Sequence, residues 1–151
     1  MRSITTLPPF GYFLATSWWA VPLLPASRNK IPQLGITTGD PAGIGPEISL
    51  RAAREPEFGG LCRLLLFGGW DLLRSRASNL GIPFEFEKIS AACIRQSRIP
   101  DRCIVDVPVG NVRAGTGSKA GGDAAAHNII ACATVCRDAL LDAVVTAPLN
   151  K

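Results

Sequence analysis

A glycine-rich segment near residue 40 has the composition of a ligand-binding turn. Residues 36–47 read Ile-Thr-Thr-Gly-Asp-Pro-Ala-Gly-Ile-Gly-Pro-Glu. Gly39, Gly43 and Gly45 permit positive φ and close approach of the backbone to a ligand, and Pro46 suits the first turn of a following helix. The free N–H groups at the start of that helix attract an anion such as phosphate. We therefore expect a substrate or cofactor site that includes Thr37, Thr38, Asp40 and Gly43.

The turn differs from the common nucleotide-binding motifs. Its glycines are spaced G-x-x-x-G-x-G rather than G-x-G-x-x-G, and the Lys-Ser/Thr pair of a P-loop does not follow. Gly110 and Gly115 have P-loop spacing, but Thr116 stands where the lysine belongs. Asp40 is expected at the carboxyl end of a strand, where open α/β sheets bind ligands. A glycine-rich turn that binds no ligand is the alternative interpretation.

The last residues of the chain are a second group of candidates. Residues 143–146 predict a strand, and Ala-Pro-Leu-Asn-Lys follows it at 147–151. A lysine at the carboxyl end of a strand binds phosphate or carboxylate as a point charge. Asn150 and Lys151 are therefore candidate ligand-binding residues, with a merely solvated lysine as the alternative. No catalytic base can be identified from the sequence.

The sequence predicts no metal site. His127 is the only histidine, and we expect it to be solvated on the polar face of a long helix. The five cysteines include no C-x-x-C pair, which argues against a zinc ribbon and a disulfide framework. Cys132 and Cys136 are expected to be small core residues. Free cysteines fit the reducing cytoplasm, which is the expected location.

Residues 1–30 differ from the rest of the chain. They hold five of the ten aromatic residues and four of the twelve prolines. Arg2, Arg28 and Lys30, with no acid, account for most of the formal net charge of +4. The longest proline-free apolar run, 10–21, is shorter than the ~20 residues that cross a bilayer, so no membrane span is expected. We interpret this segment as an upstream extension, such as one from a misplaced start codon, with a poor signal peptide as the alternative.

The remaining chain is nearly neutral, and its Lys and Arg residues form no stripe interleaved with aromatics. We therefore expect no nucleic-acid partner. From residue 31 onward, strands alternate with helices: strands are expected at 34–38, 61–67, 84–89, 102–107 and 143–146, and helices at 46–54, 70–80 and 118–140. This alternation predicts an α/β domain, residues 31–151, with a mostly parallel sheet and helices on both faces.

Two of these elements carry more specific expectations. The segment 84–89 alternates apolar and acidic residues, which predicts a half-exposed edge strand. In the long helix 118–140 we expect an apolar stripe of Ala126, Ile129, Ala133, Cys136 and Leu140 to be buried, with His127, Thr134 and Asp138 on the opposite face.

Three segments together resemble one protein family. Residues 36–47 are similar to the N-terminal signature of the 4-hydroxythreonine-4-phosphate dehydrogenases of vitamin B6 biosynthesis. Residues 110–130 resemble the family's glycine-bearing loop and the long helix after it. Residues 145–151, Val-Thr-Ala-Pro-Leu-Asn-Lys, resemble the family's Val-Thr-Ala-Pro-Ile-Asn-Lys strand end. The resemblance covers residues 31–151 in order.

The resemblance implies a fold and a reaction. The fold is like that of isocitrate and isopropylmalate dehydrogenases, and the enzyme is a homodimer. The implied reaction is the NAD-dependent oxidation of 4-phosphohydroxy-L-threonine, followed by loss of carbon dioxide to give 3-amino-2-oxopropyl phosphate. A divalent metal (Zn, Mg or Co) polarises the reacting oxygen. Relatives that use other four-carbon phosphorylated hydroxy acids are not distinguished by these segments.

The resemblance covers only the first part of the family's pattern. Members hold their metal with three histidines from later segments, and use a histidine-threonine pair that would fall just past Lys151. The resemblance thus implies the N-terminal half of an enzyme, inactive by itself; the alternative is a small α/β module that binds a phosphorylated ligand without catalysis. An uncovered sheet edge and helix face predict that the isolated chain aggregates or is partly molten.

Overall fold

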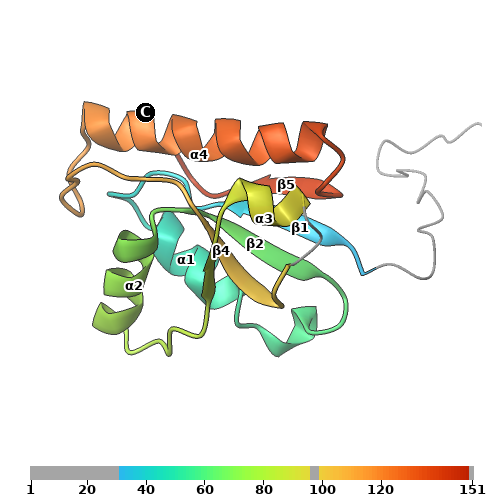
Figure 1. The fold of residues 1–151 in the computed structure, drawn as a ribbon. Coiled ribbons are helices and arrows are strands. Elements are labelled where there is room, and N and C mark those ends of the chain that lie inside the picture. Colours follow the sequence, from blue (N-terminus) through green and yellow to red (C-terminus); the bar gives the residue numbers. More distant parts are fainter. Residues whose placement is uncertain (1–30, 96–98, 150–151) are drawn as a thin grey trace, which may run out of the picture. The chain divides into compact units, whose positions relative to one another are not determined.

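The computed structural model describes residues 31–95 and 99–149 (Figure 1). In chain order the elements are β1 (Gln33–Thr37), α1 (Gly45–Ala52), the 3-10 helix η1 (Pro56–Phe58), β2 (Arg63–Gly68), α2 (Trp70–Asn79), β3 (Glu87–Ile89), α3 (Ala91–Arg95), β4 (Arg102–Asp106), α4 (Lys119–Arg137) and β5 (Ala143–Thr146). No helix in this described part has the length and hydropathy needed to cross a membrane. The interpretation of residues 1–30 as a separate extension lies outside the described residues and stays a prediction.

All five strands run parallel in one sheet, in the order β3-β4-β2-β1-β5. Strand β1 lies between β2 and β5, so that Ile36 is opposite Leu66 on one side and Val145 on the other. Parallel neighbours need a crossover connection, usually with a helix. The carboxyl ends of all the strands meet at one edge, which brings the turn after β1 next to the end of β5.

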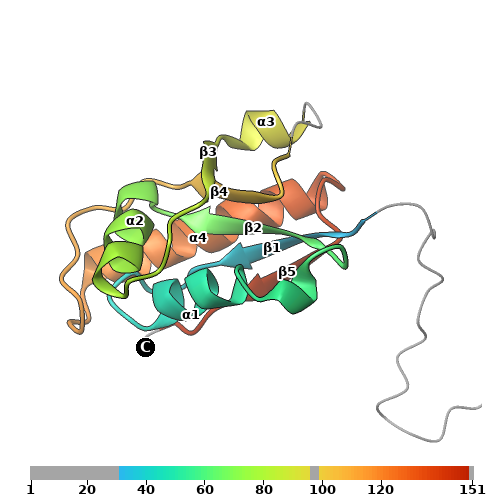
Figure 2. The ribbon, with the colours of Figure 1, turned by 90° about the horizontal axis from the view of Figure 1, so that it is seen from below.

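Helices cover both faces of the sheet, as predicted. Figures 1 and 2 show α4 on one face and α1 with α2 on the other. Strand β2 supplies side chains to both cores. Leu64 and Leu66 pack with α1 and α2, whereas Leu65 and Phe67 pack with α4 and α3. Burial on both faces explains why this strand is a continuous apolar run rather than an alternating one.

Strand β3 is shorter than the predicted strand 84–89, since its pairing with β4 begins at Glu87. Phe84 packs edge-on against Trp70, with 4.9 Å between ring centroids, and against Phe86 at 5.3 Å. The prediction of a strand from residue 84 was therefore wrong. Its alternating pattern belongs to an irregular segment that aromatic contacts hold against α2.

Helix α4 buries a different face from the predicted one. Ala126 and Ala133 of the predicted stripe are exposed. The residues that the helix buries are Gly121, Ala124, Ala125, Asn128, Cys132 and Val135. They allow close approach to the sheet, where a Cβ atom on Gly35 would lie 2.5 Å from Sγ of Cys132. Hydropathy alone disfavours a face that contains Asn128, which is why the prediction was wrong.

Strand β5 forms an open, apolar edge of the sheet. Within the described residues, no strand pairs with its outer side. Val145 is 51% exposed, although its register partner Ile36 packs against the core beneath α1. Ile48 of α1 and Leu149 after β5 are also exposed. Within the described residues this edge is apolar and exposed, and aggregation of the isolated chain stays a prediction.

Candidate functional site

Asp40 shapes the turn after β1. Its Oδ1 accepts a hydrogen bond from the N–H of Ala42 at 2.8 Å, and its carbonyl oxygen accepts one from the N–H of Gly43 at 3.0 Å. Its own N–H donates to the carbonyl of Pro148 at 3.3 Å, and the residue is only 4% exposed. Asp40 therefore stabilises the turn and ties it to the segment that follows β5.

The three glycines of the turn meet different backbone requirements. Gly39 has a φ of +69°, and a Cβ atom there would lie 2.4 Å from the carbonyl oxygen of Pro148. A Cβ atom on Gly45 would lie 2.1 Å from the carbonyl oxygen of Thr38. Gly43 has neither constraint, because its φ is not positive and a Cβ atom there would make only ordinary contacts from 3.4 Å outward. The predicted need for glycine thus applies to Gly39 and Gly45.

Thr37 and Thr38 are both buried, so neither faces the solvent at the surface of the turn. The N–H and the Oγ1 of Thr38 both donate to the carbonyl of Phe67, at 3.0 and 3.1 Å. Thr38 Oγ1 also accepts a hydrogen bond from Nδ2 of Asn128 at 3.4 Å. The Oγ1 of Thr37 is buried without a hydrogen-bond partner among the described residues.

Asn128 is a residue that sequence reasoning missed. It lies in the middle of α4, on the same face as the small residues Gly121, Ala124 and Ala125. A polar side chain in a helical row of small residues, at spacings of three and four, is the sequence signal that was available. Only the packed structure shows that this row faces the sheet and that the amide contacts Thr38.

The start of α4 also contacts the turn. Ser118 caps the helix by accepting a hydrogen bond from the N–H of Gly121 at 3.1 Å. A Cβ atom on Gly121 would lie 2.9 Å from Oδ1 of Asp40, so the carboxylate sits against the first turn of the helix. The partial positive charge of a helix N-terminus favours an anion in this position. In addition, the N–H of Gly115 donates to the carbonyl of Ala42 at 2.8 Å.

The start of α1 offers fewer free N–H groups than predicted. Pro46 lies in the first turn, as expected, and has no N–H. The N–H groups of Glu47 and Ile48 both donate to the carbonyl of Ile44 at 3.1 Å. Ile44 itself is 62% exposed, and Gly43 is half-buried. The accessible part of the turn is therefore Gly43 and Ile44 rather than the two threonines.

Asn150 and Lys151, the other predicted ligand-binding residues, lie outside the described residues. Pro148, two residues before Asn150, lies beside the turn, because its carbonyl accepts the hydrogen bond from the N–H of Asp40. The structure therefore brings Thr38, Asp40 and Pro148 together at the carboxyl edge of the sheet.

No three His, Cys, Asp or Glu residues in the described ranges lie close enough to hold a metal ion. His127 is exposed on α4. Burial raises the pKa of Cys103 and of Cys132 to about 12, so both thiols stay protonated at neutral pH. The hydrogen bond from Ser90 lowers the pKa of Cys93.

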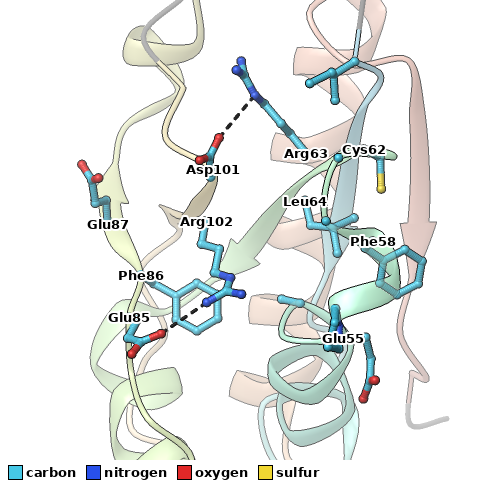
Figure 3. A pocket seen from close by; sticks show the side chains of 15 residues that line it. Glu55, Phe58, Cys62, Arg63, Leu64, Glu85, Phe86, Glu87, Asp101 and Arg102 are labelled. Carbon is cyan, nitrogen blue, oxygen red and sulfur yellow. Dashed lines mark hydrogen bonds and ion pairs between the residues drawn. The ribbon is translucent and has the colours of Figure 1, made fainter.

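Two pockets among the described residues lie away from the turn. A pocket of about 700 Å³ lies at the amino ends of the strands, between η1 and the segment before β3 (Figure 3). Figure 3 shows the ion pair of Arg102 with Glu85, at 3.2 Å, and that of Arg63 with Asp101, at 3.8 Å. A smaller pocket of about 330 Å³ lies beside the start of α2. Neither is lined by the predicted site residues. Open α/β sheets bind ligands at the carboxyl ends of their strands. The turn lies at this edge of the sheet, as does the smaller pocket beside the ends of β2 and β4, whereas the larger pocket lies at the opposite edge.

The model of the family "Pyridoxal phosphate biosynthetic protein PdxA" matches residues 60–151. The chain belongs to this family. It is 32% identical over 134 residues to a D-threonate 4-phosphate dehydrogenase of Cupriavidus necator, which covers 82% of this chain and 38% of the relative. It is 30% identical over 126 residues to a 4-hydroxythreonine-4-phosphate dehydrogenase of Geobacter metallireducens, which covers 82% of this chain and 37% of the relative.

Solved structures give the same family. The crystal structure of a 4-hydroxythreonine-4-phosphate dehydrogenase from Burkholderia phymatum matches with a TM-score of 0.73 and 28% identity, over 82% of this chain and 38% of that one. The chain thus spans less than two fifths of the length of these PdxA relatives. The match to the family model begins at residue 60, after the turn, so the assignment of ligand-binding residues in the turn stays a prediction.

Proposed function

We propose that this PdxA-family chain supplies one side of the active site of an NAD-dependent dehydrogenase that acts on a phosphorylated four-carbon hydroxy acid. In the favoured reaction, 4-phosphohydroxy-L-threonine is oxidised at its hydroxyl carbon. The product then loses carbon dioxide to give 3-amino-2-oxopropyl phosphate. Membership of the family and the names of the relatives support this reaction class. Homodimer formation and a cytoplasmic location belong to the same proposal.

The observation that carries the proposal is the convergence of three elements at the carboxyl edge of the sheet. Asp40 contacts the segment after β5 through its N–H and the first turn of α4 through its carboxylate. Thr38 fixes the end of β1 against β2. Buried hydrogen bonds hold this turn in one conformation, so it is suited to position a ligand by its backbone at Gly43 and Ile44. The chemical role we assign to the chain is therefore positioning, and the carboxylate of Asp40 serves the turn itself, because it accepts the hydrogen bond from the N–H of Ala42.

The metal that the family resemblance implies does not fit the described residues. The sole histidine, His127, is exposed, and the described ranges contain no group of three possible ligands. No step of the reaction is therefore assigned to a metal held by these residues. The proposed use of NAD likewise rests on the resemblance, and the turn lines neither of the two pockets described above.

D-threonate 4-phosphate is a second candidate substrate. The relative named for it is 32% identical to this chain, against 30% for the Geobacter metallireducens relative, so identity does not separate the two substrates. Both molecules carry a phosphate and a hydroxyl on a four-carbon chain. A further alternative is a module that binds a phosphorylated ligand without catalysis.

NADH formation, followed by absorbance, tests the proposal. We expect the 151-residue chain alone to give no turnover with either phosphorylated substrate in the presence of Zn²⁺ or Mg²⁺. Measurable turnover would refute the view that further polypeptide is needed. A chimera in which residues 31–151 replace the matching part of the Geobacter metallireducens relative is expected to produce NADH. A folded chimera that binds substrate without producing NADH would favour the non-catalytic alternative.

A further inference from the structure

Asn128 is buried in a place that general packing does not explain. It is 1% exposed, and its neighbours on the buried face of α4 are small or apolar. Burying an amide group costs free energy unless its polar atoms are hydrogen-bonded. Nδ2 donates to Oγ1 of Thr38 at 3.4 Å, whereas Oδ1 has no hydrogen-bond partner among the described residues. An apolar side chain of the same size would avoid this cost, so the amide calls for a reason other than packing.

Thr38, the partner of Asn128, is the rigid junction between β1 and the turn. Its N–H and Oγ1 both donate to the carbonyl of Phe67. A Cβ atom on Gly68 would lie 2.4 Å from Thr38 Oγ1, and one on Gly45 would lie 2.1 Å from the Thr38 carbonyl oxygen. Thr38 therefore touches β2 on one side and the start of α1 on the other. A small movement of Thr38 must move the turn as well.

Helix α4 holds the turn at two points. Gly121 lies against the carboxylate of Asp40, and Asn128 lies against Thr38. These two helix residues are seven positions apart, which is two helical turns on the same face. Thr38 and Asp40 are the residues on either side of Gly39, where the chain turns with a positive φ. Two contacts along one face fix both the rotation of the helix and its position along its axis relative to the turn.

We propose that Asn128 is a positioning residue for the turn after β1: its contact with Thr38 holds the turn in the conformation that presents Gly43 and Ile44. This role rests on the proposed function in one respect, namely that the turn faces the ligand. The contact itself needs no ligand, so it is tested without one.

Amide hydrogen exchange of residues 31–151 is the test, measured in the chimera proposed above because the isolated chain is expected to aggregate or to be partly molten. Asn128→Leu keeps the size of the side chain and removes its hydrogen-bonding groups. We expect exchange of the Ala42 and Gly43 N–H groups, which Asp40 binds, to become at least about tenfold faster. Exchange of the Leu65 and Leu66 N–H groups in β2 is expected to change less than about twofold.

Val135→Ala is the matched control, because Val135 is buried on the same helix face but belongs to the core cluster that contains Leu65 of β2. It should speed exchange in β2 and in the turn by similar factors. Thr38→Val removes the contact with Asn128 and also the hydrogen bond from Oγ1 to the carbonyl of Phe67, so it should speed exchange in the turn at least as much as Asn128→Leu. The double variant should add nothing to Thr38→Val. Thr38→Ser keeps the hydroxyl and should behave like the unsubstituted chimera.

Three results would overturn the proposal. Asn128→Leu could leave amide exchange in the turn unchanged, or it could speed exchange in the turn and in β2 by equal factors, as is expected for Val135→Ala. The unsubstituted chimera could also lack protection in β2, in which case the buried contact does not exist in it. Because no ligand is used, a negative NADH assay would count against the proposed function and leave this result unaffected.

Discussion

Replacing Gly39 with alanine should destabilise the domain strongly. A non-glycine residue in the left-handed region costs about 1–2 kcal/mol, and Gly39 has a φ of +69°. The added Cβ would lie 2.4 Å from the backbone carbonyl oxygen of Pro148, which cannot move aside as a flexible side chain can. Relieving such an overlap costs a further ~1–3 kcal/mol. The sum, about 2–5 kcal/mol, is a large share of the ~5–15 kcal/mol that stabilises a typical domain.

Gly43→Ala in the same turn is the matched control. Its Cβ would meet only ordinary contacts, the nearest at 3.4 Å. Reduced freedom of the unfolded chain should then stabilise the variant by about 0.4–1 kcal/mol. Urea unfolding followed by circular dichroism measures both changes. With a slope of about 2 kcal/mol per molar urea, Gly39→Ala should lower the midpoint by about 1–2.5 M. Equal midpoints for the two variants, or a lower one for Gly43→Ala, would refute the assignment of the backbone constraint to Gly39.

Two further predictions concern the thiols and the open edge of the sheet. Because the hydrogen bond from Ser90 lowers the pKa of Cys93, this thiol should be alkylated at a lower pH than the buried thiols of Cys103 and Cys132. In Ser90→Ala, mass spectrometry should show the midpoint of Cys93 alkylation at a higher pH. An unchanged midpoint would contradict the role of that hydrogen bond. Val145→Lys places a charge on the exposed β5 edge and should reduce self-association in sedimentation velocity. Ile130→Lys, at an exposed apolar site on the outer face of α4, should leave self-association unchanged. Equal effects of the two substitutions would count against the β5 edge as the surface through which the chain self-associates.

Hydropathy patterns and glycine positions were sufficient to predict the sheet and its crossovers. The run Leu64–Leu66 is apolar at every position because β2 is covered on both faces. The same patterns misplaced the start of β3, because Phe84 is held by aromatic contacts rather than by strand pairing. They also misplaced the buried face of α4, because its packing favours small residues around Asn128 over a larger apolar stripe.

The sequence by itself determined the family, the parallel α/β architecture and the turn after the first strand as the place to look for a site. It did so because repeated patterns and short motifs are local properties of the chain. Only the tertiary structure decided which residues of that turn are accessible. Thr38 and Asp40 are buried because α4 and the segment after β5, about 80 to 110 residues away along the chain, fold over them. A hydrogen bond between residues so far apart is a property of the packed molecule, so Asn128 emerged as a site residue only when α4 was placed against the sheet.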